Sequence, residues 1–256
     1  MADSAEASAP LAAGASSSMR LERFRAAQAS ALPERPHTWV VIGDLHGRVR
    51  RVREIPELEE ADGVILTGDL TTSGGTAAAQ HVIESIAAAQ PAVLAQIGNM
   101  DRTEVNDWLE ARGINLHRHV RQLLPNVALL GVGGSTFSPF GTPSEFPEAR
   151  FSEWLEALAL RAGSTPILVL AAHDPPYNTV CDCTSNGLHV GSSAIREFIE
   201  VHQPAVCLCG HIHESAGMER LGRTIVANPG PFSAGCYALL TLAPTGIEVS
   251  LRRLPR

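Results

Sequence analysis

Residues that can bind metal ions recur at five places where an apolar run of the chain ends. The motifs are Gly-Asp-Leu-His-Gly at 43–47, Gly-Asp-Leu at 68–70, Gly-Asn-Met-Asp at 98–101, Ala-His-Asp-Pro-Pro at 172–176 and Gly-His-Ile-His at 210–213. Imidazole and carboxylate groups are common ligands of divalent metals in proteins. Seven residues are therefore candidate metal ligands: Asp44, His46, Asp69, Asn99, His173, His211 and His213.

Each of these motifs, taken alone, also fits an ordinary structural role. Asp69 after a glycine would more often cap a helix, and Asn99 after a glycine is a common turn residue. A single histidine is more often packed or solvated than bound to a metal. His211 and His213 are harder to explain in this way, because residues two apart on a strand point to one face. The combination of all five motifs favours a metal centre.

The apolar runs that precede the motifs have the length and composition of buried strands. Strands are predicted at 38–44, 63–69, 92–99, 127–131, 166–172 and 205–210. Apolar residues at helical spacing predict helices at 48–60, 75–89, 149–161 and 191–202. Alternating strands and helices indicate an α/β sheet with crossover helices. The segments 223–227, 236–243 and 246–252, separated by turn residues, predict an antiparallel meander at the end of the chain.

Ligands of open α/β sheets bind outside the carboxyl ends of the strands. The five motifs all follow predicted strands, so we expect the seven candidate ligands to meet at one edge. Two aspartates, one asparagine and four histidines are enough for two metal ions with about four protein ligands each, provided that one carboxylate bridges them.

The composition sets limits on domain number and partners. A chain of 256 residues fits one large domain, which we place at 37–256, after a flexible extension rich in Ala and Ser at 1–36. The net charge of -7 gives no strong nucleic-acid signal. We expect no membrane span, since no run of eighteen apolar residues occurs, and no secretory signal is recognisable. These features favour a cytoplasmic protein.

The five cysteines leave two interpretations open. Four of them form two C-x-C pairs, Cys181 with Cys183 and Cys207 with Cys209, and Cys236 stands apart. Reduced, mostly buried thiols are the simpler interpretation for a cytoplasmic protein. A zinc or redox site built from the pairs is the alternative, although C-x-C is closer than the spacing of usual structural zinc sites.

The order D-x-H, G-D, G-N-x-D, H, G-H-x-H resembles that of the calcineurin-like metallophosphoesterases. These motifs span 43–213, and the stretches at 131–135, 173–177, 187–192 and 207–214 look closest to the small Icc-related phosphoesterases. The resemblance implies a fold of two mixed β-sheets packed as a sandwich and flanked by helices, in four layers ordered αββα.

The resemblance also implies the chemistry of the site. It implies two divalent metals, with Asp44, His46 and His213 at the first, Asn99, His173 and His211 at the second, and Asp69 bridging them. A hydroxide that bridges the metals would attack phosphorus in a small phosphate ester. Manganese is the metal expected to support activity in vitro, and iron, zinc, nickel or cobalt are alternatives.

One position departs from the family pattern. Many members have His at the third position of G-N-x-D, where it stabilises the transition state or protonates the leaving group, and this chain has Met100. The departure favours phosphodiesters over monoesters as substrates. His189, in a glycine-flanked loop, is the candidate general acid, although a loop-packing role fits it equally well. The alternative function is a catalytically weak metal-binding scaffold that serves as an interaction module. The natural substrate and the oligomeric state stay open.

Overall fold

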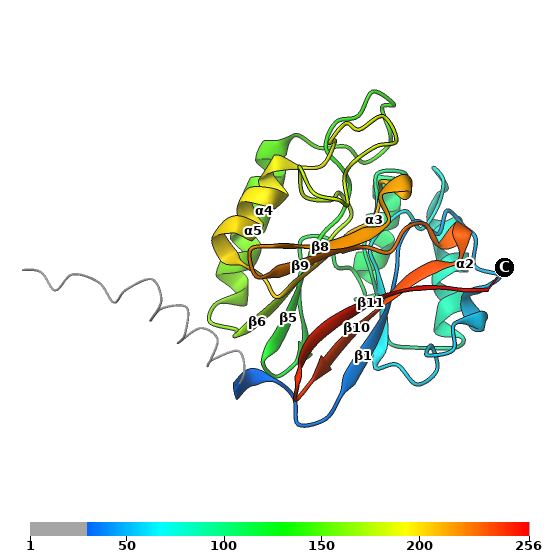
Figure 1. Cartoon of the computed structure of the whole chain (residues 1–256). Helices are drawn as coiled ribbons and strands as arrows, with labels where there is room; N and C mark the ends of the chain where they lie inside the picture. Colours follow the sequence, from blue (N-terminus) through cyan, green and yellow to red (C-terminus); the bar gives the residue numbers. More distant parts are fainter. Residues whose placement is uncertain (1–29, 256) are drawn as a thin grey trace, which may run out of the picture.

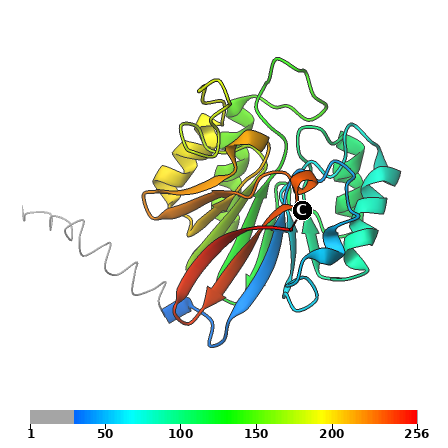
Figure 2. The same cartoon turned by 45° about the vertical axis from the view of Figure 1, so that its right-hand side comes forward.

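The computed structural model describes residues 30–255. The predicted extension at 1–36 therefore lies outside the described residues except for 30–36, and its boundary stays a prediction. Two mixed β-sheets lie face to face, and helices cover the outer face of each (Figure 1). This is the predicted αββα sandwich, and the turned view separates the four layers (Figure 2).

The first sheet has five strands in the order β11-β10-β1-β2-β3. β1, β2 and β3 are parallel, and β10 and β11 continue the sheet as an antiparallel hairpin. The strands are β1 (His37–Ile42), β2 (Gly63–Leu66), β3 (Val93–Ala95), β10 (Cys236–Ala243) and β11 (Gly246–Arg253).

The second sheet has six strands in the order β4-β5-β6-β7-β9-β8. Its four central strands are parallel, and an antiparallel strand closes each edge. The strands are β4 (Val120–Leu124), β5 (Val127–Val132), β6 (Ile167–Ala172), β7 (Val206–Leu208), β8 (Gly217–Leu221) and β9 (Thr224–Asn228).

Three apolar cores hold the four layers together. The first sheet packs against α2 (Thr76–Ala87) and α3 (Thr103–Ala111). The second sheet packs against α4 (Glu148–Ala162) and α5 (Ser193–His202). The third core lies between the two sheets. Central strands are buried on both faces, so they appear in the sequence as continuous apolar runs rather than as alternating patterns.

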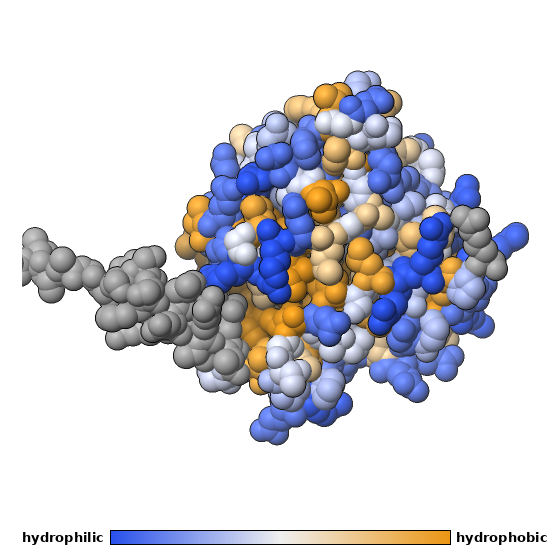
Figure 3. Space-filling model, in the orientation of Figure 1, coloured by the Kyte–Doolittle hydropathy of each residue, from blue (hydrophilic) through white to orange (hydrophobic). Residues whose placement is uncertain are grey.

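Strand β1 shows how one short run serves two cores. Val40 and Ile42 face the helices, whereas Trp39 and Val41 face the other sheet. Successive side chains of a strand point to opposite faces, so this alternation follows directly from the extended backbone. Figure 3 shows hydrophobic residues gathered between β11 and the β8–β9 hairpin on the face seen there, with hydrophilic residues over much of the rest.

The helix predicted at 48–60 is wrong. This segment contains only the short 3-10 helix η1 (Val52–Glu54), followed by turns. Pro56 lacks the N–H that a helix needs and disfavours helical backbone in the residue before it. Ile55 is accordingly extended, with φ of -69° and ψ of 113°. The regularly spaced Val52, Ile55 and Leu58 are nevertheless buried.

The antiparallel meander predicted for the end of the chain is only partly right. β10 and β11 form the expected hairpin, but β9 belongs to the other sheet, where it pairs in parallel with β7. The chain crosses between the sheets through Asn228-Pro229-Gly230 and the 3-10 helix η3 (Phe232–Ala234). The prediction did not include α3, β4 or β8.

The state of the cysteines and the length of the helices also bear on the sequence predictions. All five cysteines are free thiols, and Cys181, Cys207 and Cys209 are buried. Within residues 30–255, no helix combines the length and the apolar composition needed to cross a bilayer.

Candidate metal centre

The seven candidate ligands come from the carboxyl ends of strands in both sheets. Asp44 and His46 follow β1, Asp69 follows β2, and Asn99 lies four residues after β3. His173 follows β6, and the pair at 211 and 213 follows β7. The sandwich therefore brings the two sets of strand ends to one edge, as the sequence predicted.

The backbone at the strand ends is held in an uncommon conformation. Asp44, His46, Asp69 and His211 have positive φ angles of 54°, 47°, 51° and 68°. Such a conformation costs roughly 1–3 kcal/mol for a residue other than glycine and persists where the surroundings enforce it. Here, the N–H of Asp44 donates to the carbonyl of Gly68 at 3.1 Å, and the N–H of His46 donates to that of Asp69 at 2.9 Å. Strain that is maintained in this way is typical of functional sites.

One cluster of donor atoms combines Asp44, His46 and His213. The Nε2 atom of His213 lies 3.2 Å from Oδ1 of Asp44 and 3.3 Å from Nε2 of His46. On its other side, the His46 ring contacts the Thr72 hydroxyl through Nδ1, at 3.1 Å. The Thr72 contact leaves the His46 Nε2 atom directed at the cluster.

A second cluster combines Asp44, Asp69 and His173, with Asn99 beside it. The Nε2 atom of His173 lies 3.0 Å from Oδ1 of Asn99 and 3.5 Å from Oδ1 of Asp69. The ring of His211 has its centroid 5.2 Å from that of His173.

Asp69 faces both clusters. Its Oδ1 atom is the one near His173, whereas its Oδ2 atom lies 3.6 Å from Nε2 of His46. Gly98 packs closely against this carboxylate, and a Cβ atom added to Gly98 would collide with it. The N–H of Met100 also donates to Oδ1 at 2.8 Å. Asp69 is thus fixed with one oxygen toward each cluster.

The donor atoms fit divalent metal ions in both type and spacing. Ligand atoms bound at about 2.0–2.2 Å from a metal lie about 3.0–3.5 Å from one another, which matches the separations above. Asp44 and Asp69 are 1% and 2% exposed. Two buried carboxylates so close together need cationic partners, because burial of unpaired charge is costly. These residues can therefore hold metal ions.

The charges of the candidate ligands raise the pKa values of some of these ligands and lower those of others. Burial opposes ionisation of Asp69, but His173 and His46 overcome this effect and lower the pKa of Asp69. Burial likewise disfavours the charged form of His173, yet Asp69 and Asp44 raise its pKa to about 9. Burial and the neighbouring His173 lower the pKa of His211 to about 4. A hydrogen bond to Asp44 raises the pKa of His213.

Asp101 connects two of the ligand-bearing loops. Its carboxylate accepts hydrogen bonds from the N–H groups of Leu70 at 2.9 Å, Thr71 at 2.8 Å and Gly98 at 2.9 Å. Burial and the charge of Asp69 nevertheless raise the pKa of Asp101 to about 6. The acidic residue of the G-N-x-D motif therefore positions the backbone beside Asp69 and Asn99.

A chain of hydrogen bonds orients the Asn99 amide. Nδ2 of Asn99 donates to the hydroxyl of Thr142 at 2.9 Å, so Oδ1 faces His173. The Thr142 hydroxyl donates in turn to Oε1 of Glu145 at 2.6 Å. Thr142 and Glu145 lie in the loop 138–145, for which no such role was predicted, because the contact joins residues 43 positions apart.

His189 is separate from the seven candidate ligands. Its Nδ1 atom lies 2.7 Å from Oδ1 of the buried Asp182, and its ring contacts that of Tyr177. Among the described residues, no hydrogen bond, ion pair or ring contact joins it to a candidate ligand. Its side chain is 33% exposed. The role of general acid therefore stays a prediction.

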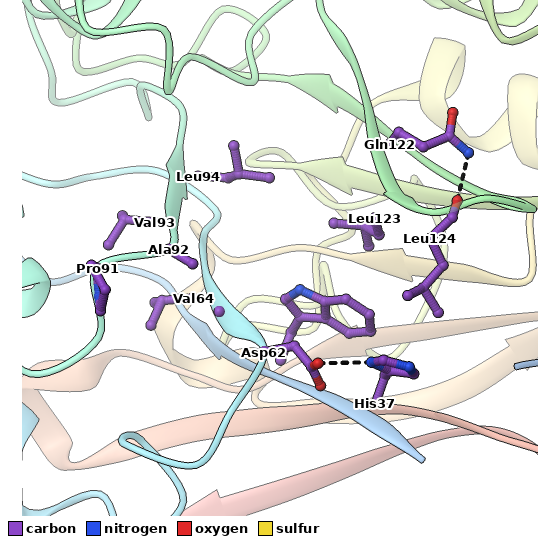
Figure 4. Close-up of a pocket in the computed structure, with 12 residues that line it drawn as sticks. His37, Asp62, Val64, Pro91, Ala92, Val93, Leu94, Gln122, Leu123 and Leu124 are labelled. Atoms are coloured by element: carbon purple, nitrogen blue, oxygen red, sulfur yellow. Dashed lines mark hydrogen bonds and ion pairs between the residues drawn. The ribbon is translucent and has the colours of Figure 1, made fainter. Parts of the chain in front are cut away.

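A cavity of about 380 Å³ lies at the opposite ends of the strands of the first sheet (Figure 4). His37 and Trp39 at the start of β1 line it together with Leu123 and Leu124. The close-up shows His37 paired with Asp62, at 2.7 Å. No candidate metal ligand lines this cavity.

Comparison with known proteins identifies the family. Residues 37–215 match the model of the calcineurin-like phosphoesterases, which is more than half of the chain. The chain belongs to the calcineurin-like phosphoesterase family. The resemblance inferred from the motifs is thereby confirmed.

Two relatives of this calcineurin-like phosphoesterase differ in what is known of them. An uncharacterised protein of Methanocaldococcus jannaschii is 38% identical over 205 residues, which cover 77% of this chain and 90% of that protein. The 3',5'-cyclic adenosine monophosphate phosphodiesterase CpdA of Escherichia coli K12 is 28% identical over 201 residues, 74% of this chain and 70% of CpdA.

A solved structure supports the fold of this phosphoesterase. The protein TT1561 of Thermus thermophilus superposes with a TM-score of 0.65 at 18% identity, over 85% of this chain and 98% of that chain. At this identity the likeness shows the shared sandwich alone.

Proposed function

We propose that this phosphoesterase hydrolyses phosphodiesters at a centre of two divalent metal ions. The observation that carries the proposal is the position of Asp69, whose two carboxylate oxygens face separate clusters of imidazole and carboxylate donors. One metal is assigned to Asp44, His46 and His213, the other to Asn99, His173 and His211, and Asp69 to both.

The protein and the metals have distinct tasks in this proposal. Two divalent cations would neutralise charge on the phosphoryl group and lower the pKa of a bound water. Asp101 holds the loops that carry Asp69 and Asn99 at a fixed separation. Thr142 fixes which atom of the Asn99 amide faces the centre. The chain thus supplies a preorganised set of ligands, so little reorganisation is needed when the substrate binds.

The preference for diesters follows from position 100. A positioned general acid contributes about 10²–10⁴-fold when a leaving group needs a proton. The Met100 side chain cannot donate a proton, and its backbone N–H is already bonded to Asp69. Esters with good leaving groups depend least on such an acid. The relationship to CpdA, a cyclic nucleotide phosphodiesterase, also supports diester chemistry.

The proposal is tested with protein stripped of metal by a chelator and then supplied with manganese. We expect bis(p-nitrophenyl) phosphate to be hydrolysed only after metal is added, with a kcat/KM at least about tenfold above that for an alkyl monoester such as glycerol 2-phosphate, whose leaving group needs a proton. A His173→Ala variant, purified in parallel, controls for contaminating phosphatases. Faster cleavage of the monoester would overturn the diester preference.

The scaffold alternative predicts a different result. A chain that binds manganese, iron, zinc, nickel or cobalt but cleaves neither ester with any of them would be a binding module. His189→Gln tests the candidate general acid in the same assay. A selective loss with poor leaving groups is expected if His189 donates the proton, and an unchanged dependence on the leaving group would remove it from the mechanism.

A further inference from the structure

Four arginines follow the first metal-ligand motif almost without interruption. They are Arg48, Arg50, Arg51 and Arg53, in a chain whose net charge is -7. The segment starts beside the candidate metal centre, because Gly47 directly follows His46 and its N–H donates to the carbonyl of Leu70 at 2.8 Å. Positive charge is therefore concentrated next to the site in an otherwise acidic protein.

Three of these arginines line a cavity of about 420 Å³. The lining residues are Gly47, Arg48, Arg50, Arg51, Phe232 and Ser233. Phe232 ties the cavity to the loop that carries the first metal ligands, because its N–H donates to the carbonyl of Gly43 at 3.1 Å. Figures 1 and 2 show the segment after β1, η3 and the end of β11 close together.

The arginines of the cavity differ in their partners. Arg51 donates to Oε2 of Glu54 at 2.8 and 2.7 Å and to the carbonyl of Pro255 at 2.6 Å. Arg48 and Arg50 are exposed, and within residues 30–255 their guanidinium groups form no hydrogen bond or ion pair. Two positive charges in the cavity are therefore available for a ligand.

We propose that this cavity binds a terminal phosphate of the substrate while a phosphodiester of the same molecule lies at the metal centre. The inference rests on the proposed function and narrows its substrate class. Guanidinium groups bind phosphate through paired, charge-assisted hydrogen bonds. The Cα atom of Arg48 lies at most about 7.6 Å from that of His46, because consecutive Cα atoms are about 3.8 Å apart. The cavity is therefore next to the first cluster along the chain, since Gly47, which lines it, directly follows His46.

The preferred substrate is then a phosphodiester with a second, terminal phosphate, such as a 5'-phosphorylated dinucleotide. A cyclic mononucleotide has only one phosphate and would leave the arginine-lined cavity unused. On this basis, the chain should differ in substrate preference from its relative CpdA, which is named as a cyclic adenosine monophosphate phosphodiesterase.

The test compares two substrates that differ only in the terminal phosphate, pApA and ApA, with the metal-loaded protein. In the wild type, we expect kcat/KM for pApA to exceed that for ApA at least about tenfold, mainly through KM. Arg48→Gln and Arg50→Gln should each lower this pApA:ApA ratio about tenfold, because charge-assisted hydrogen bonds are the stronger ones. Using the ratio removes any general effect of a substitution on catalysis.

Arg53→Gln is the matched control. Arg53 is an exposed arginine of the same segment but does not line the cavity. We expect its pApA:ApA ratio to stay within about twofold of wild type. If the ratio falls as much in Arg53→Gln as in Arg48→Gln and Arg50→Gln, the effect is general electrostatic attraction, and the proposed phosphate site in the cavity is wrong.

Two further measurements make the outcome decisive. Calorimetry with metal-free protein should show tighter binding of pApA than of ApA, and this difference should disappear in Arg48→Gln. A steady rise in affinity with oligonucleotide length would indicate binding along a nucleic-acid backbone and overturn the terminal-phosphate site.

Turnover of bis(p-nitrophenyl) phosphate reports the phosphoesterase activity itself. If esters are cleaved but the pApA:ApA ratio is near one, the proposed phosphate site in the cavity is wrong and the proposed function stands. If no ester is cleaved, the proposed function is wrong.

Discussion

At the scale of single residues, the sequence was enough to propose the seven candidate ligands, because metal ligands are specified by side-chain type and by place in the chain. The Gly-Asp and Gly-His motifs follow strands whose apolar runs are plain in the sequence, and parallel strands bring their carboxyl ends to one edge. The residues that orient the ligands were not predictable in this way. Thr142 reaches Asn99 across 43 positions, and nothing in the local sequence of the loop indicates this contact.

The first residue-scale prediction concerns Met100. Met100→His should raise the monoester-to-diester ratio of kcat/KM, because a proton donor would then stand at the position that lacks one. The rise should be near tenfold rather than the full 10²–10⁴-fold of a well-positioned acid. Asp101, its neighbour in the motif, cannot orient the new ring, since its carboxylate already accepts from Leu70, Thr71 and Gly98. An unchanged ratio in a folded, fully metallated variant would show that position 100 does not control leaving-group chemistry.

The second residue-scale prediction concerns Thr142. Thr142→Val removes the acceptor of the Asn99 amide and leaves the shape of the side chain nearly the same. We expect metal affinity at the Asn99 site to fall roughly 10–100-fold, the usual effect of losing a residue that orients a ligand. Thr184→Val is the control, because in the described part of the chain the Thr184 hydroxyl bonds only within its own loop, at Leu188. Equal metal affinity in Thr142→Val and wild type would contradict the positioning role.

At the scale of elements, the sequence indicates strands best where both faces are covered. β1, β2, β5 and β6 appear as continuous apolar runs, and all were predicted. β4 and β8 lie at sheet edges and are only partly buried, so they give no such run. α3 was missed because it is short and buries only Val105 and Leu109. The segment 48–60 shows the opposite error, since apolar spacing suggested a helix that Pro56 prevents.

The loop 138–145 carries an element-scale prediction on pH. Partial burial of Glu145 opposes its ionisation, but hydrogen bonds from Ser138 and Thr142 prevail and lower its pKa to about 2. A carboxyl whose pKa is lower in the folded state stabilises the fold above its ordinary pKa of about 4.5 and loses this effect as the pH falls toward 2.

The measurement is the difference in urea unfolding midpoint between wild type and Glu145→Gln as a function of pH. We expect the wild type to be more stable by a constant amount from pH 7 to about 4.5, and the difference to shrink below that pH. A difference that does not change with pH would mean that the charge of Glu145 contributes nothing to stability.

At the scale of the whole molecule, the sandwich and its family were predictable because the five motifs occur in one order across both halves of the chain. The place of β9 in the second sheet could not be predicted, because a turn sequence such as Asn228-Pro229-Gly230 does not reveal which sheet the neighbouring strands join. The candidate metal centre draws on both sheets: Asp44 and Asp69 come from one, and His173 and His211 from the other.

This arrangement predicts that metal binding stabilises the whole fold. Ligands that bind only the folded state raise stability by about 2.7 kcal/mol at a free concentration of 100 times Kd. Adding manganese to the stripped protein should therefore raise Tm by several degrees. The same addition to His173→Ala should raise it less, because one ligand from the second sheet is lost. An equal rise in both proteins would indicate that the metal binds elsewhere.

We propose that Asp69 is shared by two metal ions, and the metal content of purified variants tests this sharing. Wild type, Asp69→Ala and His213→Ala are loaded with manganese under the same conditions, desalted, checked for folding by circular dichroism and analysed for metal per chain. We expect about two ions in the wild type, about one in His213→Ala and nearly none in Asp69→Ala, because Asp69 directs one carboxylate oxygen toward each cluster. Two ions per chain in a folded Asp69→Ala variant would contradict the claim.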